Sequence, residues 1–243
     1  MKFNVVTLFP DLISNFLSEG MLNRSIEKNF ISIDIFNPRD FTDNRNNRVD
    51  DRPFGGGPGM VIQAEPIIKC LESIKKDRSN TFTLLSSPRG IPLTQSKVIE
   101  YSTKEEINIV CGRYGGIDER VISNGIDEIF SIGDYVVNGG ELPALVLIES
   151  IARMTEGFLG NETSNKEDSF INGLLETPQY TRPEKSNFGN VPKVLLSGDH
   201  EKIRKWKLKI SLSETFLKRP DLLKGLKLTN EEKEILDKIK REE

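Results

Sequence analysis

Short runs of β-branched and apolar residues alternate with segments of helical pattern through the first two thirds of the chain. The expected strands are residues 4–9, 31–36, 81–86, 107–111 and 128–132. The expected helices between them are residues 11–17, 64–76, 94–101, 118–124 and 141–155. Strands that alternate with helices pair in parallel, and the helices cover both faces of the sheet. The order therefore predicts an α/β domain built on a mostly parallel sheet.

The alternation ends in a polar stretch, LGNETSNKED, at residues 159–168. Beyond it the sequence favours helices over 203–213, 214–217 and 231–241, and it has no convincing series of strands. We therefore expect a first domain of residues 1–160, a flexible linker of residues 161–171 and a small helical domain of residues 172–243.

Charge is divided unevenly between these parts. The chain has 34 Lys+Arg and 37 Asp+Glu, a net charge of −3. From Asn172 onward 16 basic and 12 acidic residues give +4, so residues 1–171, with 18 and 25, carry −7. Within 201–219 seven basic residues are opposed only by Glu201 and Glu214. This stretch is either a phosphate-binding helix surface or an ordinary solvated helix face.

Several classes of protein and site are excluded by what the sequence lacks. It has no apolar run long enough for a membrane span and no signal-peptide pattern, so we expect a cytoplasmic protein without a membrane partner. Cys70 and Cys111 are far apart, which argues against a disulfide framework and a thiolate metal site. His200 is the only histidine. General-base chemistry therefore falls mainly to carboxylates.

Glycine-bearing loops follow three of the expected strands, at residues 86–90 (SSPRG), 112–116 (GRYGG) and 132–140 (IGDYVVNGG). Open α/β sheets bind ligands at the carboxyl ends of their strands, so these loops predict one shared pocket.

A fourth glycine cluster, RPFGGGPGM at residues 52–60, follows Asp50 and Asp51. It is not a phosphate-binding P-loop, because Met60 and Val61 stand where a lysine and a serine or threonine are needed. It is either a flexible loop or a place where another molecule approaches the backbone closely.

Six segments occur in order: DDRPFGGGPGM, GRYGGIDER, SIGDYVVNGGELPALVLIES, EDSF, TRPE and LLSGDH…IRKWK. Together they resemble the bacterial tRNA (guanine-N1)-methyltransferase family, and the match runs from TLFPD at 7–11 to LKRPDLL at 217–223. The family is similar to the SPOUT methyltransferases, whose sheet has a C-terminal trefoil knot. The resemblance implies methyl transfer from S-adenosylmethionine to N1 of guanine 37, beside the anticodon. It also implies a homodimer with a shared active site, contact with the tRNA anticodon arm, and Mg²⁺, for which no clear ligand cluster is visible.

The resemblance also implies roles for individual residues. Asp168 in EDSF would be the general base, and Arg153 would support it and the guanine O6. On sequence alone, each residue has an alternative role: Asp168 as a helix N-cap and Arg153 as a solvated arginine on a helix. The implied substrate contacts are Asp50, Arg52, Gly59, Lys205 and Lys207. The implied cofactor contacts lie in the three loops and are Leu85, Ser86, Ser87, Pro88, Gly112, Arg113, Tyr114, Ile132, Gly133, Asp134, Tyr135, Val136, Val137, Gly139, Gly140 and Pro143.

Two positions depart from the family pattern. Gly115 stands where the family usually has Glu, and Asn46 where a histidine is common. Two other functions therefore remain open. One is a ribose 2′-O-methyltransferase of the same superfamily, and the other is a non-catalytic RNA-binding protein that has kept the fold.

Overall fold

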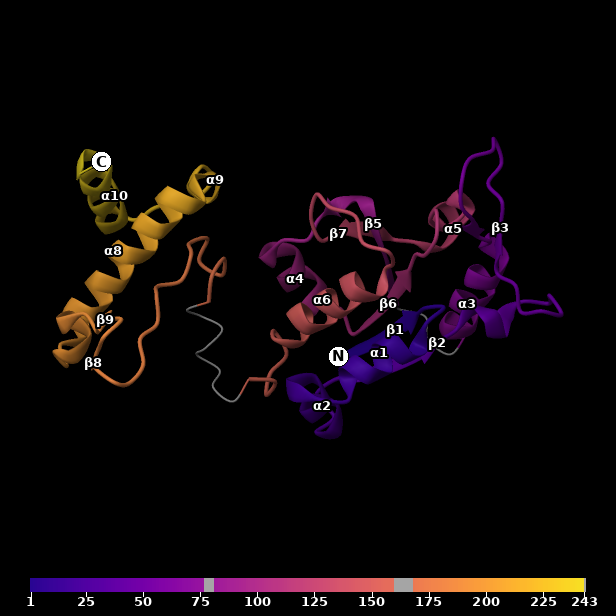
Figure 1. The fold of residues 1–243 in the computed structure, drawn as a ribbon, viewed down its shortest axis with the longest axis horizontal. Helices are drawn as coiled ribbons and strands as arrows, with labels where there is room; N and C mark the ends of the chain where they lie inside the picture. Colours follow the sequence, from indigo (N-terminus) through magenta and orange to yellow (C-terminus); the bar gives the residue numbers. More distant parts are fainter. Residues whose placement is uncertain (77–80, 160–167, 243) are drawn as a thin grey trace. The chain divides into compact units, whose positions relative to one another are not determined.

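The computed structural model describes residues 1–76, 81–159 and 168–242, and the chain divides into two compact units, Met1–Gly160 (unit 1) and Asn161–Glu243 (unit 2). Unit 1 is built on one five-stranded sheet of order β2-β1-β6-β5-β7, in which every pair is parallel (Figure 1). The strands are β1 (Lys2–Val6), β2 (Ser32–Phe36), β5 (Phe82–Pro92), β6 (Glu106–Cys111) and β7 (Glu128–Ser131). The predicted parallel α/β sheet is thus confirmed.

Helices cover both faces of this sheet. They are α1 (Pro10–Leu17), α2 (Gly20–Glu27), α3 (Ala64–Lys76), α4 (Gln95–Ser102), α5 (Glu119–Gly125) and α6 (Glu141–Ala152), with a 3₁₀ turn, η1, at Pro38–Phe41. Val5 and Ile109 belong to the core shared with α1, α4 and α6, and Val6 and Val110 to the core shared with α3 and α5. Because neighbouring strand residues point to opposite faces, the sheet has two cores. The near-continuous apolar runs of its strands follow from this double burial.

Three features of unit 1 differ from the expectation. The sequence analysis did not predict α2, and it did not predict the antiparallel pair β3 (Asp50–Asp51) and β4 (Val61–Ile62) that encloses the 52–60 loop. Residues 86–90 were expected as a loop after a strand, but β5 continues to Pro92 through an irregularity. Both Ser86 and Ile91 pair with Phe130, so the residues between them bulge out of the ladder.

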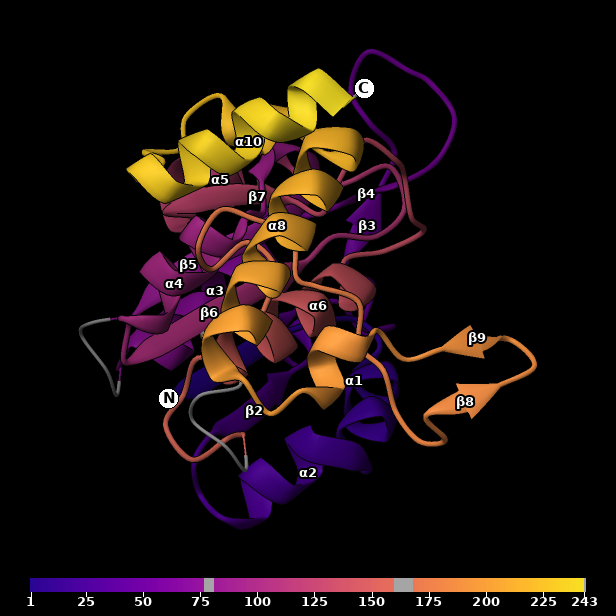
Figure 2. The ribbon, with the colours of Figure 1, turned by 90° about the vertical axis from the view of Figure 1, so that its left-hand side faces the viewer.

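Unit 2 has a small core of its own around Leu174, Leu212 and Ile239. Its elements are β8 (Lys185–Ser186), β9 (Gly189–Asn190), the 3₁₀ turn η2 (Lys193–Leu196), α8 (His200–Lys218), α9 (Pro220–Leu223) and α10 (Asn230–Glu242) (Figure 2). The expected helices at 203–213 and 214–217 are one continuous helix. It begins at His200 because the Asp199 side chain accepts a hydrogen bond from the Lys202 N–H at 3.1 Å.

The expectation of a purely helical second domain is also corrected, because β8 and β9 form an antiparallel hairpin. Each of these strands is two residues long, too short to produce a periodic sequence pattern. Residues 161–167 of the expected linker lie outside the described residues. Among the helices of the described ranges, none is long and apolar enough to cross a membrane.

Candidate functional site

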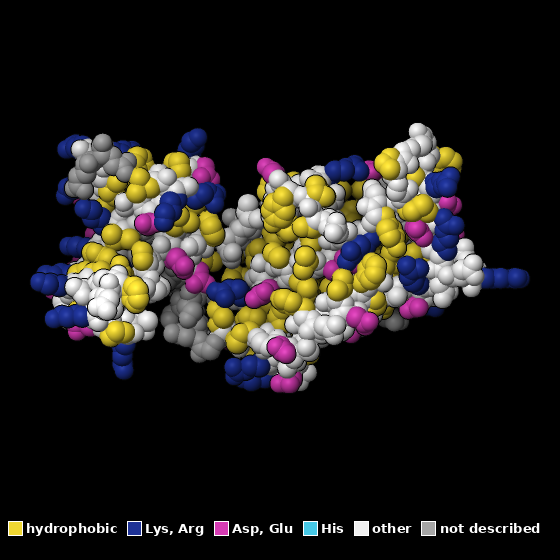
Figure 3. All heavy atoms as spheres, viewed as in Figure 1, with side chains coloured by type: hydrophobic (Ala, Val, Ile, Leu, Met, Phe, Trp, Pro, Cys, Tyr) yellow, Lys and Arg dark blue, Asp and Glu magenta, His cyan; other side chains and the backbone are white. Residues whose placement is uncertain are grey.

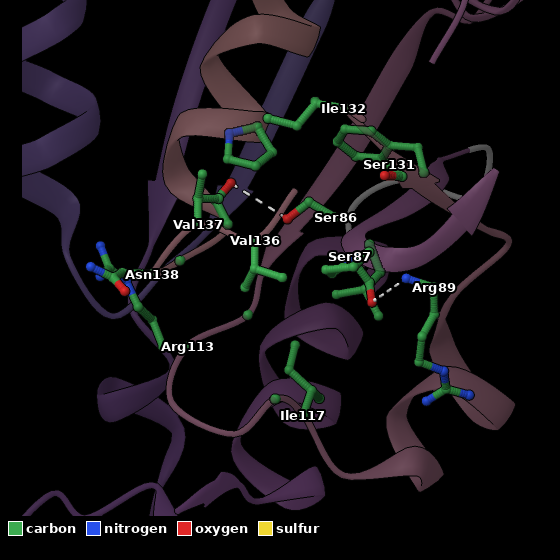
Figure 4. A pocket seen from close by; sticks show the side chains of 18 of the residues that line it. Ser86, Ser87, Arg89, Arg113, Ile117, Ser131, Ile132, Val136, Val137 and Asn138 are labelled. Carbon is green, nitrogen blue, oxygen red and sulfur yellow. Dashed lines mark hydrogen bonds between the residues drawn. The ribbon is translucent and has the colours of Figure 1, made fainter. Parts of the chain in front are cut away.

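A cavity of about 390 Å³ lies in unit 1 beside the bulge of β5 and the ends of β6 and β7 (Figure 4). It is lined by 14 of the 16 cofactor contacts implied by the resemblance, all except Gly133 and Asp134. The three glycine-bearing loops therefore converge, as expected of loops at the carboxyl ends of parallel strands. Eight further lining residues were not named individually from the sequence, namely Arg89, Gly115, Gly116, Ile117, Ile122, Phe130, Ser131 and Asn138. Most of them lie inside or beside the predicted loops, so their position in the sequence was enough to predict them. Ile122 belongs to α5, and its place at the cavity follows only from the folded structure.

Backbone contacts hold the loops against one another. Gly140 donates its N–H to the Gly112 carbonyl at 2.8 Å, and Arg113 and Gly139 form an isolated antiparallel bridge. A Cβ added at Gly140 would lie 2.4 Å from the Ser86 Oγ and 2.7 Å from the Cys111 Cα. These distances are far below van der Waals contact, so only glycine fits where the loops cross.

Gly140→Ala is expected to lower the free energy of unfolding by about 1–3 kcal/mol, the usual cost of forcing an extra group into a packed site. Urea denaturation of the full chain measures the change. Gly112→Ala is the matched control, because a Cβ there would meet only the Ile117 side chain at 3.7 Å. If both variants unfold at the same urea concentration, close packing does not explain the glycine at position 140.

A buried charged network adjoins the cavity. Glu141, only 2 % exposed, accepts a hydrogen bond from the Thr7 hydroxyl at 2.7 Å, and its Oε2 lies 2.8 Å from the Arg113 Nε. Within the described residues neither Nε nor Oε2 has a well-directed hydrogen bond, so their contact is chiefly ionic. The Arg113 guanidinium also lies 4.4 Å from the centre of the Phe9 ring. The network thus joins β1, the loop after β6 and the start of α6.

Sequence reasoning missed Glu141. Its signal was weak, since an acidic residue in the first turn of a helix is common on electrostatic grounds alone. The expected cofactor contact Arg113 depends on it for charge compensation.

The loop between β3 and β4 is attached to the same region. Gly115 donates its N–H to the Met60 carbonyl at 2.7 Å, and Ile62 donates to the Gly116 carbonyl at 3.0 Å. A Cβ at Gly115 would lie 2.9 Å from the Met60 oxygen, so the glycine at this departure from the family pattern permits the close approach. The expected substrate residues Asp50, Arg52 and Gly59 all lie on this segment.

The two expected catalytic residues lie in different units. Arg153 caps the C-terminal end of α6 in unit 1, and Asp168 is the first described residue of unit 2. Asp168 is half-buried, and its carbonyl accepts a hydrogen bond from the Ile171 N–H at 3.4 Å. The residues directly after it form turns, so the alternative interpretation of Asp168 as a helix N-cap is not supported.

The basic stretch of α8 is more neutralised than the sequence suggested. Arg204 pairs with Glu201 and also with Glu231 of α10, at 3.1 and 2.8 Å. The ion pairs of this stretch include Lys202 with Asp199, Arg204 with Glu201 and Glu231, Lys205 with Glu201, Lys218 with Glu214, and Arg219 with Asp221. Three of the acidic partners, Asp199, Asp221 and Glu231, lie outside residues 201–219, so the charge of that stretch alone does not include them.

Neither cysteine has the properties of a reactive thiol. Burial raises the pKa of the Cys70 thiol to about 12, and burial together with Glu141 raises that of Cys111 well above its usual range. Both thiols are therefore protonated and poor nucleophiles near neutral pH. In the parts of the chain that the structure describes, no three His, Cys, Asp or Glu side chains are grouped to hold a metal ion.

Comparison with known proteins adds independent evidence. A family model described as tRNA (Guanine-1)-methyltransferase TrmD matches residues 1–225. A tRNA (guanine-N(1)-)-methyltransferase of Marinomonas sp. (strain MWYL1) is 47 % identical over 242 residues, covering 100 % of this chain and 97 % of that protein. The enzyme of the same name from Buchnera aphidicola subsp. Baizongia pistaciae (strain Bp) is 50 % identical over 238 residues, covering 97 % and 95 %. The resemblance drawn from the six motifs is confirmed.

Proposed function

The chain belongs to the tRNA (guanine-1)-methyltransferase family, and from that premise we propose that it transfers the methyl group of S-adenosylmethionine to N1 of guanine 37 in tRNA. The observation that carries this proposal is the cavity of unit 1, because the family's cofactor motifs line it. A cytoplasmic location suits an enzyme that modifies tRNA.

The cavity has the properties needed for S-adenosylmethionine. Its volume of about 390 Å³ lies within the range usual for small-molecule sites, roughly 300–1,000 Å³. Ile117, Ile132 and Val136 contribute apolar side chains to its lining (Figure 4), and the loops offer backbone N–H and C=O groups that can hydrogen-bond an adenine edge. The bound cofactor supplies an electrophilic methyl group on a sulfonium. The role of the chain is to hold it and to exclude water.

We further propose that the three glycine-bearing loops, of which residues 132–140 are the last segment, form a trefoil knot, as in SPOUT proteins. Two contacts support this: the Gly140 N–H bond to Gly112 and the bridge between Gly139 and Arg113. They hold this segment tightly against the end of β6, where a threaded chain would have to pass.

Asp168 and Arg153 are proposed as the catalytic residues. N1 of guanine carries a proton, so a base has to remove it before the nitrogen can attack, and negative charge then develops on O6. Asp168 accepts the N1 proton, and the Arg153 guanidinium stabilises the charge on O6. Mg²⁺ is proposed as an accessory ion held partly by substrate phosphates, which is how it commonly binds.

Substrate binding is assigned to two surfaces. Asp50 and Gly59 would contact the target guanine and its neighbour, and Arg52 a phosphate. Lys205 and Lys207 of α8 would contact the backbone of the anticodon arm. In the domain division that we propose, residues 172–243 form the tRNA-binding part and residues 161–171 the linker.

A homodimer is supported by an apolar surface on unit 1. Four large apolar side chains here are 40–62 % exposed: Phe9 just before α1, Phe16 within α1, and Leu142 and Val146 on α6. The helices α1 and α6 contact each other. Figure 3 shows hydrophobic side chains gathered over this region. Exposed apolar patches commonly mark protein interfaces. We propose a second copy of this chain as the partner, and light scattering of the full chain measures the oligomeric state.

Methylation of a tRNA transcript that carries guanosine 37 tests the proposed function. Mass spectrometry of the digested RNA should detect 1-methylguanosine. Detection of a 2′-O-methylated nucleoside instead would identify the ribose methyltransferase alternative. Failure to bind S-adenosylmethionine in calorimetry would favour the non-catalytic RNA-binding alternative.

Reversing the charge of both Lys205 and Lys207 to Glu is expected to weaken tRNA binding while leaving S-adenosylmethionine affinity unchanged. If both lysines contact phosphates, the slope of log K against log salt concentration should fall by about 2, since each phosphate contact accounts for about 1. Filter binding over a salt series measures the slope. The control reverses Lys224 and Lys227, which are exposed in the same unit and give the same change of net charge. Equal losses of tRNA and cofactor binding would contradict this separation of roles.

A further inference from the structure

Residues 178–190 of unit 2 are exposed without a break. This segment includes the β8–β9 hairpin, in which Lys185 pairs with Asn190 and Ser186 with Gly189 (Figure 2). Phe188 occupies the turn and is 100 % exposed, and Tyr180 on the same segment is 49 % exposed. Two aromatic side chains thus remain in water although unit 2 has an apolar core that could have received them.

The hairpin turn is held in shape by its own hydrogen bonds. The Ser186 hydroxyl accepts from the Phe188 N–H at 3.2 Å and donates to the Gly189 carbonyl at 2.9 Å. Gly189 has φ +125°, a conformation that side chains disfavour, and the Val191 N–H bonds to the Glu184 carbonyl at 2.9 Å just beyond the hairpin. The chain therefore presents the Phe188 ring from a defined turn.

The charges around the aromatic side chains favour a polyanionic partner. Arg182 and Lys185 lie on the exposed segment and Lys193 follows it, whereas Glu184 is the only acidic residue between 177 and 198. Exposed aromatic rings beside basic side chains are typical of surfaces that bind unpaired nucleotides, because rings stack on bases while cations meet phosphates.

We propose that Phe188 stacks on an unpaired base of the RNA substrate, with Arg182 and Lys185 against neighbouring phosphates. This contact rests on the proposed function, which makes RNA the substrate, and it adds a binding site outside the cavity and outside α8. Every base offers an aromatic face, so the contact supplies affinity without selecting a sequence.

The test compares three variants of the full chain in binding to a tRNA transcript. Phe188→Ala should raise the Kd for tRNA about five- to a hundredfold, the range reported by alanine substitution at stacked bases. Phe188→Leu keeps an apolar side chain but should also bind weakly, whereas Phe188→Trp should bind as the wild type does. Leu217→Ala is the control, because it removes another side chain that is 55 % exposed in unit 2 and should leave the Kd unchanged.

A second measurement reports stacking directly. The fluorescence of Phe188→Trp should be quenched by tRNA beyond the change seen in the wild type, whose single tryptophan is Trp206. Equal Kd values for Phe188→Ala and wild type would overturn the proposal. Binding of tRNA by Phe188→Leu as tightly as by Phe188→Trp would also overturn it, because the contact would then need no aromatic ring. If the wild type forms no 1-methylguanosine and binds no tRNA, the proposed function itself fails.

Discussion

Replacing Asp168 with alanine is expected to lower the rate of methyl transfer about 10²- to 10⁴-fold, the usual contribution of a general base. Without the carboxylate, nothing at this position removes the N1 proton. While N1 keeps that proton, its lone pair is delocalised into the ring and is a poor nucleophile towards the sulfonium methyl. Asp168 is assigned to the proton of the substrate guanine and is not among the residues that line the cavity, so the affinity for S-adenosylmethionine should not change. Single-turnover methylation of a tRNA transcript measures the rate, and calorimetry measures the affinity.

Two further variants distinguish the loss of a base from a loss of structure. Asp168→Asn keeps the shape of the side chain but should be as slow as Asp168→Ala, because an amide does not accept the proton. Glu176→Gln neutralises an exposed carboxylate elsewhere in unit 2 and should react at the wild-type rate. A fast Asp168→Asn variant would place the base elsewhere in the chain.

The sheet of unit 1 could be predicted because its signal is local and repeated. The inner strands β1, β5 and β6 bury residues on both faces, so their residues form near-continuous apolar runs such as INIVC at 107–111, and a helix follows each of these strands. The cavity could be predicted for the same reason, since the loops simply follow the strands. The ion pair between Arg204 and Glu231 could not, because Glu231 is 27 residues from Arg204 and meets it only after α10 packs on α8.

The β8–β9 hairpin and Glu141 were missed for different reasons. A strand of two residues has no period to detect, so the exposed Phe188 looked like one more residue of an irregular segment. Glu141 looked like a solvated helix residue because most glutamates are. Its burial depends on Thr7 and Arg113, which are 134 and 28 positions away and come close only in the folded sheet.

Glu141→Gln is expected to lower the free energy of unfolding by about 3–5 kcal/mol, the usual cost of removing one partner of a buried ion pair. The amide can still accept a hydrogen bond from Thr7, but it leaves Arg113, whose side chain is 19 % exposed, without its counter-charge. A Cβ at Gly139 would lie 2.2 Å from the Arg113 Nε, so the guanidinium is packed against the loop and cannot move without disturbing it. Affinity for S-adenosylmethionine should therefore fall together with stability.

Urea denaturation and cofactor calorimetry measure the two effects, and Glu119→Gln provides the control. Glu119 pairs with Arg89, another arginine of the cavity lining, at 2.8 Å, but its side chain is 61 % exposed. Its loss should leave the free energy of unfolding nearly unchanged, because water screens exposed pairs. In a double variant, Arg113→Met with Glu141→Gln, removing both charges should recover part of the stability lost in Glu141→Gln alone. If Glu141→Gln unfolds like Glu119→Gln, or if the second substitution only adds to the loss, then packing rather than charge holds the loop at Arg113.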